Sequence, residues 1–275
     1  MVRGYTGRCD MKMRSMLAAM LMSLPPVAHA ATFTYAPFDP TGSDSPESVR
    51  IVGEIKVGDL ERLRALIRSD VSRFKRSTIV LASNGGDILE AMKIGDLIRS
   101  SYVSVFVNKD IGICASACFL IYVSAVERGA TYPAVGVHRP YFGEEHFAGL
   151  SVKDAERKQS KLYAALREFL RSRDVPQAIQ ERMFALASSE IYWLTFDDLD
   201  RIGPRAHWYD ELMVSRCGLD KRLERGFIEM GDRFAEAAEA NEHIHRVAVC
   251  AYTLTADEGE AALRRFAFEA GREKR

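Results

Sequence analysis

Short β-branched segments alternate with segments of helical periodicity over the first half of the chain. This order is typical of an α/β fold in which most strands of the sheet are parallel. Buried parallel strands read as short apolar runs, and helices show apolar residues three and four positions apart. We expect strands at 49–55, 77–82, 102–107 and 134–137, and helices at 57–69, 88–99 and 115–122.

Three glycine-containing or polar loops, at 83–87, 110–116 and 138–142, each follow a predicted strand. The carboxyl ends of parallel strands meet at one edge of a sheet, where the sites of α/β proteins form. The three loops are therefore predicted to lie together and to build the site.

Residues 1–30 read as a secretory signal peptide. Lys12 and Arg14 precede a short apolar run at 15–24, and Ala28-His29-Ala30 is a cleavage site of the A-x-A kind. The run is far below the roughly 20 residues of a spanning helix. We expect an exported protein, periplasmic or secreted, cut after Ala30 and without a stable membrane span; an uncleaved signal anchor is the alternative.

The remaining chain divides by composition. Residues 31–48 read as an extended N-terminal segment, residues 49–210 as the α/β domain, and residues 211–275 as a small, mainly helical C-terminal region. Further helices are predicted at 152–170, at 176–187 and after Thr195, which has Asp198 three residues later as in a capping box.

The charges balance, with 38 basic and 38 acidic residues, and no basic run stands out. Nucleic-acid binding normally needs a clustered positive face, so a nucleic-acid partner is not expected.

Four cysteines follow the signal peptide: Cys114, Cys118, Cys217 and Cys250. An even number in an oxidising compartment favours disulfides, and four cysteines allow three pairings. We prefer Cys217 with Cys250, because both lie in the C-terminal part. Cys114 and Cys118 share a face if helical, and either a disulfide or two buried free thiols fits that spacing.

The stretch 112–122 offers a candidate nucleophile. Ser116 has an alanine on each side, near a helix start where free amides and the positive dipole end collect. The Gly85-Gly86 pair can bring further backbone amides close, and His138, at a strand end, can serve as the base. A packed core serine is the alternative.

These motifs resemble the Clp protease proteolytic subunit and the ClpP/crotonase superfamily. More closely, the chain is similar to exported ClpP-like bacterial proteins with a Cys-Ala-Ser-Ala-Cys core. The resemblance covers about residues 51–204 and is carried by SNGGD at 83–87, GICASA at 112–117 and VHRP at 137–140. It implies a ClpP/crotonase-like ββα spiral core.

The resemblance also implies roles for single residues. Ser116 matches the nucleophile, His138 the general base, and the backbone amides of Gly86 and Ala117 the oxyanion hole. The chain departs from the pattern at the catalytic aspartate, whose position falls on or near Ile191, beside the carboxylate of Glu190. Glu190, a water or a backbone carbonyl is left to orient His138.

The implied function is that of an exported serine hydrolase, a ClpP-like endopeptidase cleaving peptides or unfolded chains. Outside the cytoplasm there is no ATP supply, so no ATP-driven unfoldase is expected as a partner. A homo-oligomer is possible, and neither a cofactor nor a metal is predicted. The alternatives are a weak or inactive ClpP-fold binding or scaffold protein and, against the signal peptide, a crotonase-type acyl-CoA enzyme.

Other polar residues receive structural assignments. Asp87 is predicted to cap the helix that follows it. We interpret His146, His207, His243 and His245 as surface or structural histidines. Zinc sites at Cys114, Cys118 and His138, or at the His243-x-His245 pair, are disfavoured because each lacks ligands.

Overall fold

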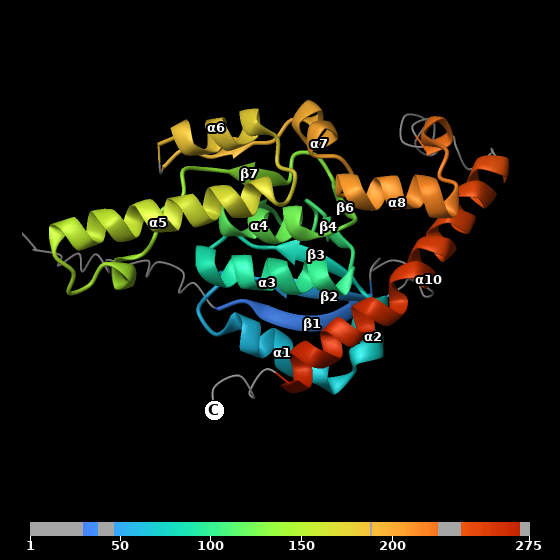
Figure 1. The fold of residues 1–275 in the computed structure, drawn as a ribbon, viewed down its shortest axis with the longest axis horizontal. Helices are drawn as coiled ribbons and strands as arrows, with labels where there is room; N and C mark the ends of the chain where they lie inside the picture. The colour runs from blue at the N-terminus through green and yellow to red at the C-terminus, as the bar shows by residue number, and fades with distance from the viewer. Residues whose placement is uncertain (1–29, 38–46, 188, 225–237, 270–275) are drawn as a thin grey trace, which may run out of the picture.

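The computed structural model describes residues 30–37, 47–187, 189–224 and 238–269 (Figure 1). The predicted signal peptide, except Ala30, lies outside the described residues. Within these ranges no helix is long and apolar enough to cross a membrane.

A five-stranded sheet forms the centre of the molecule, in the order β1-β2-β3-β4-β6. Every neighbouring pair in it is parallel except β1 with β2, so the predicted α/β class with mostly parallel strands is confirmed. The strands are β1 (Thr32–Pro37), β2 (Glu47–Val52), β3 (Thr78–Ala82), β4 (Val105–Val107) and β6 (Arg128–Ala130).

The sheet and its helices pack against each other through buried apolar side chains. Ile51, Ile79 and Leu81 on the strands are fully buried, as are Ile94 and Ile98 on α3. Helix α4 is buried at every position, which fits its uniformly apolar sequence. The helices of this half are α1 (Asp59–Ser69), α2 (Val71–Arg76), α3 (Ile88–Ser101) and α4 (Ala117–Ser124).

A second sheet of three short strands lies beside the first: β5 (Cys114–Ala115), β7 (Val135–Val137) and β8 (Tyr192–Trp193), in the order β5-β7-β8. The helix predicted from residue 115 begins instead at Ala117, because the chain first completes β5 and then turns at Ser116. Strands β5 and β6 were not predicted, since two or three residues are too few to show a period.

The segment predicted to be merely extended joins the sheet. Residues 32–37 form β1, an edge strand antiparallel to β2, with Phe33 paired to Ile51. Phe33 and Tyr35 pack partly against the core, and Ala31 is buried.

The second half of the chain is helical, as predicted. It forms α5 (Val152–Arg171), α6 (Gln177–Ala185), α7 (Phe196–Ile202), α8 (His207–Cys217) and α10 (Ala238–Glu269). The capping box of Thr195 and Asp198 is present. Helix α10 runs back over α8, α2 and α1 (Figure 1), and its Leu263 and Ala267 are part of the main core. The C-terminal helix therefore shares the core of the α/β unit.

Candidate active site

Ser116 occupies a sharp turn between a strand and a helix. It follows β5, has φ 58° and ψ −126°, and precedes the first residue of α4. A positive φ is uncommon for a residue other than glycine and is costly unless its surroundings enforce it. The nucleophilic serine of α/β hydrolases also sits on a strained strand-to-helix turn.

Two disulfide-bonded cysteines bracket this turn. Cys114 in β5 and Cys118 in the first turn of α4 are joined, with 5.2 Å between their Cα atoms. The second disulfide, Cys217–Cys250, connects α8 to α10 and is the pair that sequence reasoning preferred. Because Cys114 and Cys118 are bonded to each other, they offer no thiolates for a zinc ion with His138.

The glycine loop packs directly on Ser116. A Cβ on Gly85 would lie 2.5 Å from the Ser116 Cβ and 2.9 Å from the Ala117 nitrogen. Gly85 has φ 103° and Gly86 φ 136°, and a Cβ on Gly86 would collide with the Ile55 carbonyl oxygen. Only glycines permit this close approach.

Two backbone amides at this point are available to an anion. In the β-bridge between Ile55 and Gly86, the Ile55 amide donates to the Gly85 carbonyl and the Asp87 amide donates to the Ile55 carbonyl. The Gly86 amide takes no part in these two hydrogen bonds. Among the residues that the structure describes, neither this amide nor that of Ala117 donates to a backbone carbonyl. Ala117 directly follows Ser116 and opens a buried helix whose dipole favours negative charge, and Gly86 follows the Gly85 that packs on Ser116.

A buried arginine anchors the other end of the same helix. Arg128 donates to the carbonyls of Val123 (2.8 Å) and Ala125 (3.3 Å) at the end of α4. Burial lowers the pKa of Arg128 to about 10, and burial likewise raises the pKa of Tyr122 to about 12. At neutral pH the charged guanidinium therefore stabilises the end of the helix that positions Ser116.

His138 leaves β7 beside the serine turn. Strand β7 is parallel to β5, with Ala115 opposite Gly136, and the Ser116 amide donates to the Gly136 carbonyl at 3.1 Å. Nδ1 of His138 lies 2.8 Å from the Arg139 carbonyl oxygen. A hydrogen bond there requires the proton on Nδ1, so Nε2 becomes the basic nitrogen. No hydrogen bond joins His138 to Ser116 within the described ranges.

The position that the resemblance gives to the third triad member holds an aliphatic side chain. Strand β8 is antiparallel to β7, with Val137 opposite Tyr192, and the same register places Ile191 opposite His138. Glu190 is exposed, and its carboxylate accepts a hydrogen bond from the Ala187 amide at 3.0 Å. The Arg139 carbonyl, and not Glu190, is the group that contacts the histidine.

Two hollows flank the glycine loop. One, of about 620 Å³, is lined by residues 52–54, 82–86 and 111–113. The other, of about 400 Å³, is lined by residues 54–57, 86–88, 141–143, 145 and 146. Loop 83–87 lines both hollows, together with loop 110–116 at the first and loop 138–142 at the second, so the three loops do lie close together. Ser116 and His138 are not among the residues that line either hollow.

The residues around His146 were not predicted as a group. Asp87 caps α3 as expected, but its second oxygen faces His146, which lies in a short 3₁₀ turn, η1 (Glu144–His146). Loop residues carry no periodic pattern, so nothing in the sequence places His146 beside Asp87. The buried His243, in contrast, contacts the Asp220 amide through Nε2 and Arg246 through Nδ1.

Comparison with known proteins leaves the family of this chain open. No protein-family model and no curated protein matches the sequence. Similar solved structures include a serine-to-alanine mutant of a membrane-bound stomatin-specific protease, with 19% identity, 62% of this chain and 83% of that chain covered, and a TM-score of 0.37. Two enoyl-CoA hydratases also match. The one from Mycobacterium marinum has 16% identity and a TM-score of 0.35, with 88% of this chain and 98% of that chain covered. The one from Thermoplasma volcanium has 15% identity and a TM-score of 0.35, with 83% of this chain and 94% of that chain covered. At these values the likenesses carry no argument about chemistry or partners.

Proposed function

We propose that this chain is an exported serine hydrolase, a ClpP-like peptidase that cleaves peptides or unfolded chains without an ATP-driven partner. The observation that supports this most is the strained turn at Ser116, placed at the start of a buried helix with the Gly86 and Ala117 amides unused beside it. A strained serine next to free amides is the arrangement that acyl transfer requires.

In the proposed reaction, Nε2 of His138 accepts the proton of the Ser116 hydroxyl as Oγ attacks the substrate carbonyl. The amides of Gly86 and Ala117 hold the oxyanion of the tetrahedral intermediate. His138 then returns the proton to the leaving amine, and water hydrolyses the acyl-enzyme by the same steps. The Arg139 carbonyl takes the orienting role that an aspartate has in a complete triad.

A weak or inactive ClpP-fold binding protein is the second candidate, and a specific observation favours it. The β7–β8 register, continued one residue past Val137 and Tyr192, places the aliphatic Ile191 opposite His138, where a complete triad has a carboxylate. Loss of the triad acid costs about 10⁴ in kcat in a serine protease, which makes a low rate the expectation even if the site works.

Hydrolysis by the mature chain from Ala31 separates the two candidates. The substrates are an activated ester and fluorescently quenched unfolded casein, and the variants are Ser116→Ala and His138→Ala. We expect slow hydrolysis that both variants abolish. Turnover that survives in Ser116→Ala, or folded protein that hydrolyses neither substrate, would favour the binding role.

Export and assembly belong to the same proposal. Two disulfides are compatible with an oxidising compartment outside the cytoplasm. N-terminal sequencing of the protein from a periplasmic fraction should begin at Ala31, and light scattering of that protein would show whether it is a homo-oligomer.

A further inference from the structure

A hollow of about 400 Å³ is lined by Gly86 and its neighbours on one part and by residues 141–146 of the loop after β7 on another. Three potential metal ligands lie along it. Asp87 comes from the glycine loop, and Glu145 and His146 come from η1. None of them has a role in the proposed serine chemistry.

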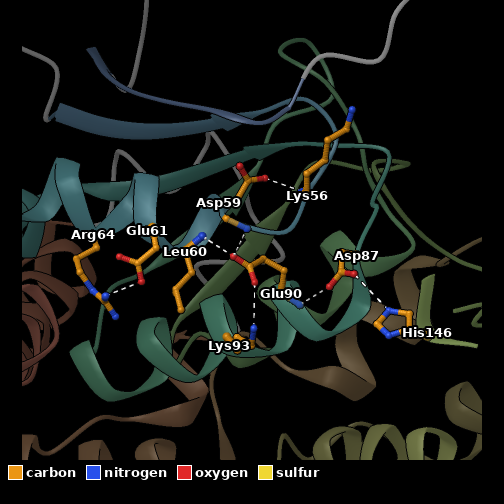
Figure 2. Close-up of polar contacts among 10 residues, drawn as sticks. Lys56, Asp59, Leu60, Glu61, Arg64, Asp87, Glu90, Lys93 and His146 are labelled. Atoms are coloured by element: carbon orange, nitrogen blue, oxygen red, sulfur yellow. Dashed lines mark hydrogen bonds and ion pairs between the residues drawn. The ribbon is translucent and has the colours of Figure 1, made fainter. Parts of the chain in front are cut away.

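The separations of these ligand atoms suit a shared cation better than hydrogen bonds. Nε2 of His146 lies 3.6 Å from Oδ2 of Asp87 and 3.6 Å from Oε1 of Glu145. All three donor atoms fall within 4.8 Å of one another. Hydrogen bonds between such groups are about 2.7–3.2 Å long. Two ligands of a tetrahedral zinc ion with bonds of about 2.1 Å are roughly 3.4 Å apart. Figure 2 shows the imidazole of His146 turned toward the Asp87 carboxylate.

The surroundings hold Asp87 and His146 in place. Oδ1 of Asp87 accepts the Glu90 amide at 2.6 Å, so Oδ2 is the oxygen left for a ligand (Figure 2). The Phe142 ring packs edge-on against the His146 ring, with 6.0 Å between centroids. The Glu145 side chain is exposed, and its carboxylate folds back over Gly143, where a Cβ would collide with both of its oxygens.

The hollow is also negatively charged. Its lining contains the carboxylates of Glu54, Asp87 and Glu145 and the ammonium of Lys56, which pairs with Glu54 at 3.3 Å. With His146 neutral, two negative charges are left over near the imidazole. A bound cation can offset them.

We propose that Asp87, Glu145 and His146 bind one divalent cation of the zinc type, with the fourth position open to the hollow. One imidazole and two carboxylates suit zinc, whereas magnesium and calcium prefer oxygen ligands only. The ion joins the loop after β7 to the residue next to Gly86, and so steadies one side of the candidate oxyanion hole. The site does not depend on Ser116 being a nucleophile.

Zinc binding to the full mature chain tests this directly, by equilibrium dialysis with metal analysis. We expect one equivalent at micromolar zinc, and at least about tenfold weaker binding in Asp87→Asn and in His146→Ala. Asparagine caps a helix as well as aspartate does, so Asp87→Asn separates ligation from stability. His245→Ala, at an exposed histidine of α10, is the matched control and should bind as the unaltered protein does.

Three results would overturn the proposal. They are the absence of zinc binding by the folded protein, unchanged affinity in His146→Ala, and displacement of zinc by equimolar magnesium or calcium.

Discussion

At Ser116 the chain adopts a backbone conformation that a serine rarely takes, and three neighbours explain why it persists. The Cys114–Cys118 disulfide spans the turn, and Gly85 packs against it without a side chain. Such strain is found where a site needs a group held in one position. The residue opposite His138 is where this chain departs most from a complete triad.

Restoring the acid there is the first prediction. Ile191→Asp should raise the rate of ester hydrolysis by ten- to a hundredfold, because a carboxylate opposite His138 stabilises the imidazolium. Ile191→Asn has the same size without the charge and serves as control. Equal rates for the two variants would mean that His138 is not the base.

The buried Lys75 leads to a prediction of how the stability of the protein depends on pH. It lies in α2 and is buried, and its ammonium donates to the Tyr102 carbonyl at 3.1 Å. Burial lowers the pKa of Lys75 to about 8, although Glu127 opposes the shift. The protonated lysine therefore costs stability below pH 8, and this cost disappears as pH rises toward 10.5, where the unfolded chain also loses the proton.

Urea unfolding at several pH values measures this effect. Between pH 7 and pH 10, the free energy of unfolding of the unaltered protein should rise by up to about 3 kcal/mol relative to that of the Lys75→Met variant. The exposed Lys109→Met should show no such trend. A pH-independent difference for Lys75→Met would contradict the assignment.

At the scale of elements, helix α1 is capped by a residue of another helix. Its N-cap, Gly58, has no side chain, and the buried Glu90 of α3 accepts the amides of Gly58 (3.0 Å) and Leu60 (2.8 Å) in its place (Figure 2). Lys93 pairs with the same carboxylate at 3.2 Å. The cap thus fixes α1 to α3.

Glu90→Ala should lower the free energy of unfolding by about 2–3 kcal/mol, because it leaves buried amides without an acceptor. Glu61, exposed and paired with Arg64 on the surface of α1, is the control, and Glu61→Ala should change stability by less than about 1 kcal/mol. Denaturant titration of both variants gives the comparison, and equal effects would rule out the capping role.

Sequence reasoning found the elements whose patterns are long enough to read. The strands at β3 and β7 and the helices α3 and α5 lie within a few residues of their predicted bounds. It also placed the three loops at one edge. It did not find β5 or β6, because strands of two or three residues are too short to show a period and depend on their partner strands. It read residues 32–37 as an extended segment, and their pairing with β2 makes them the edge strand β1. Two further contacts depend on loop conformation, which leaves no periodic pattern in the sequence. They are the contact of His138 with the Arg139 carbonyl and that of Asp87 with His146.

For the whole molecule, helix α10 acts as a strap across the α/β unit. It contacts α1, α2, α3 and α8, and the Cys217–Cys250 bond fixes its N-terminal half to α8. Its burial of Leu263 in the main core argues that the C-terminal region does not fold separately.

Replacing both cysteines by serine should therefore reduce the free energy of unfolding by about 3 kcal/mol. The bond closes a loop of 33 residues, and the loss follows from the freedom that the unfolded chain regains. Thermal and denaturant unfolding of Cys217→Ser with Cys250→Ser measure it. A change below about 0.5 kcal/mol would show that packing alone holds helix α10 against the rest of the protein.

Reaction of the mature protein with a fluorophosphonate tests the central claim most directly. Only an activated serine is modified by this reagent, and mass spectrometry of the digested adduct identifies the residue. We predict one adduct on Ser116, absent in Ser116→Ala and strongly reduced in His138→Ala. Folded protein that stays unmodified, or an adduct on another residue, would contradict the assignment of Ser116 as a nucleophile.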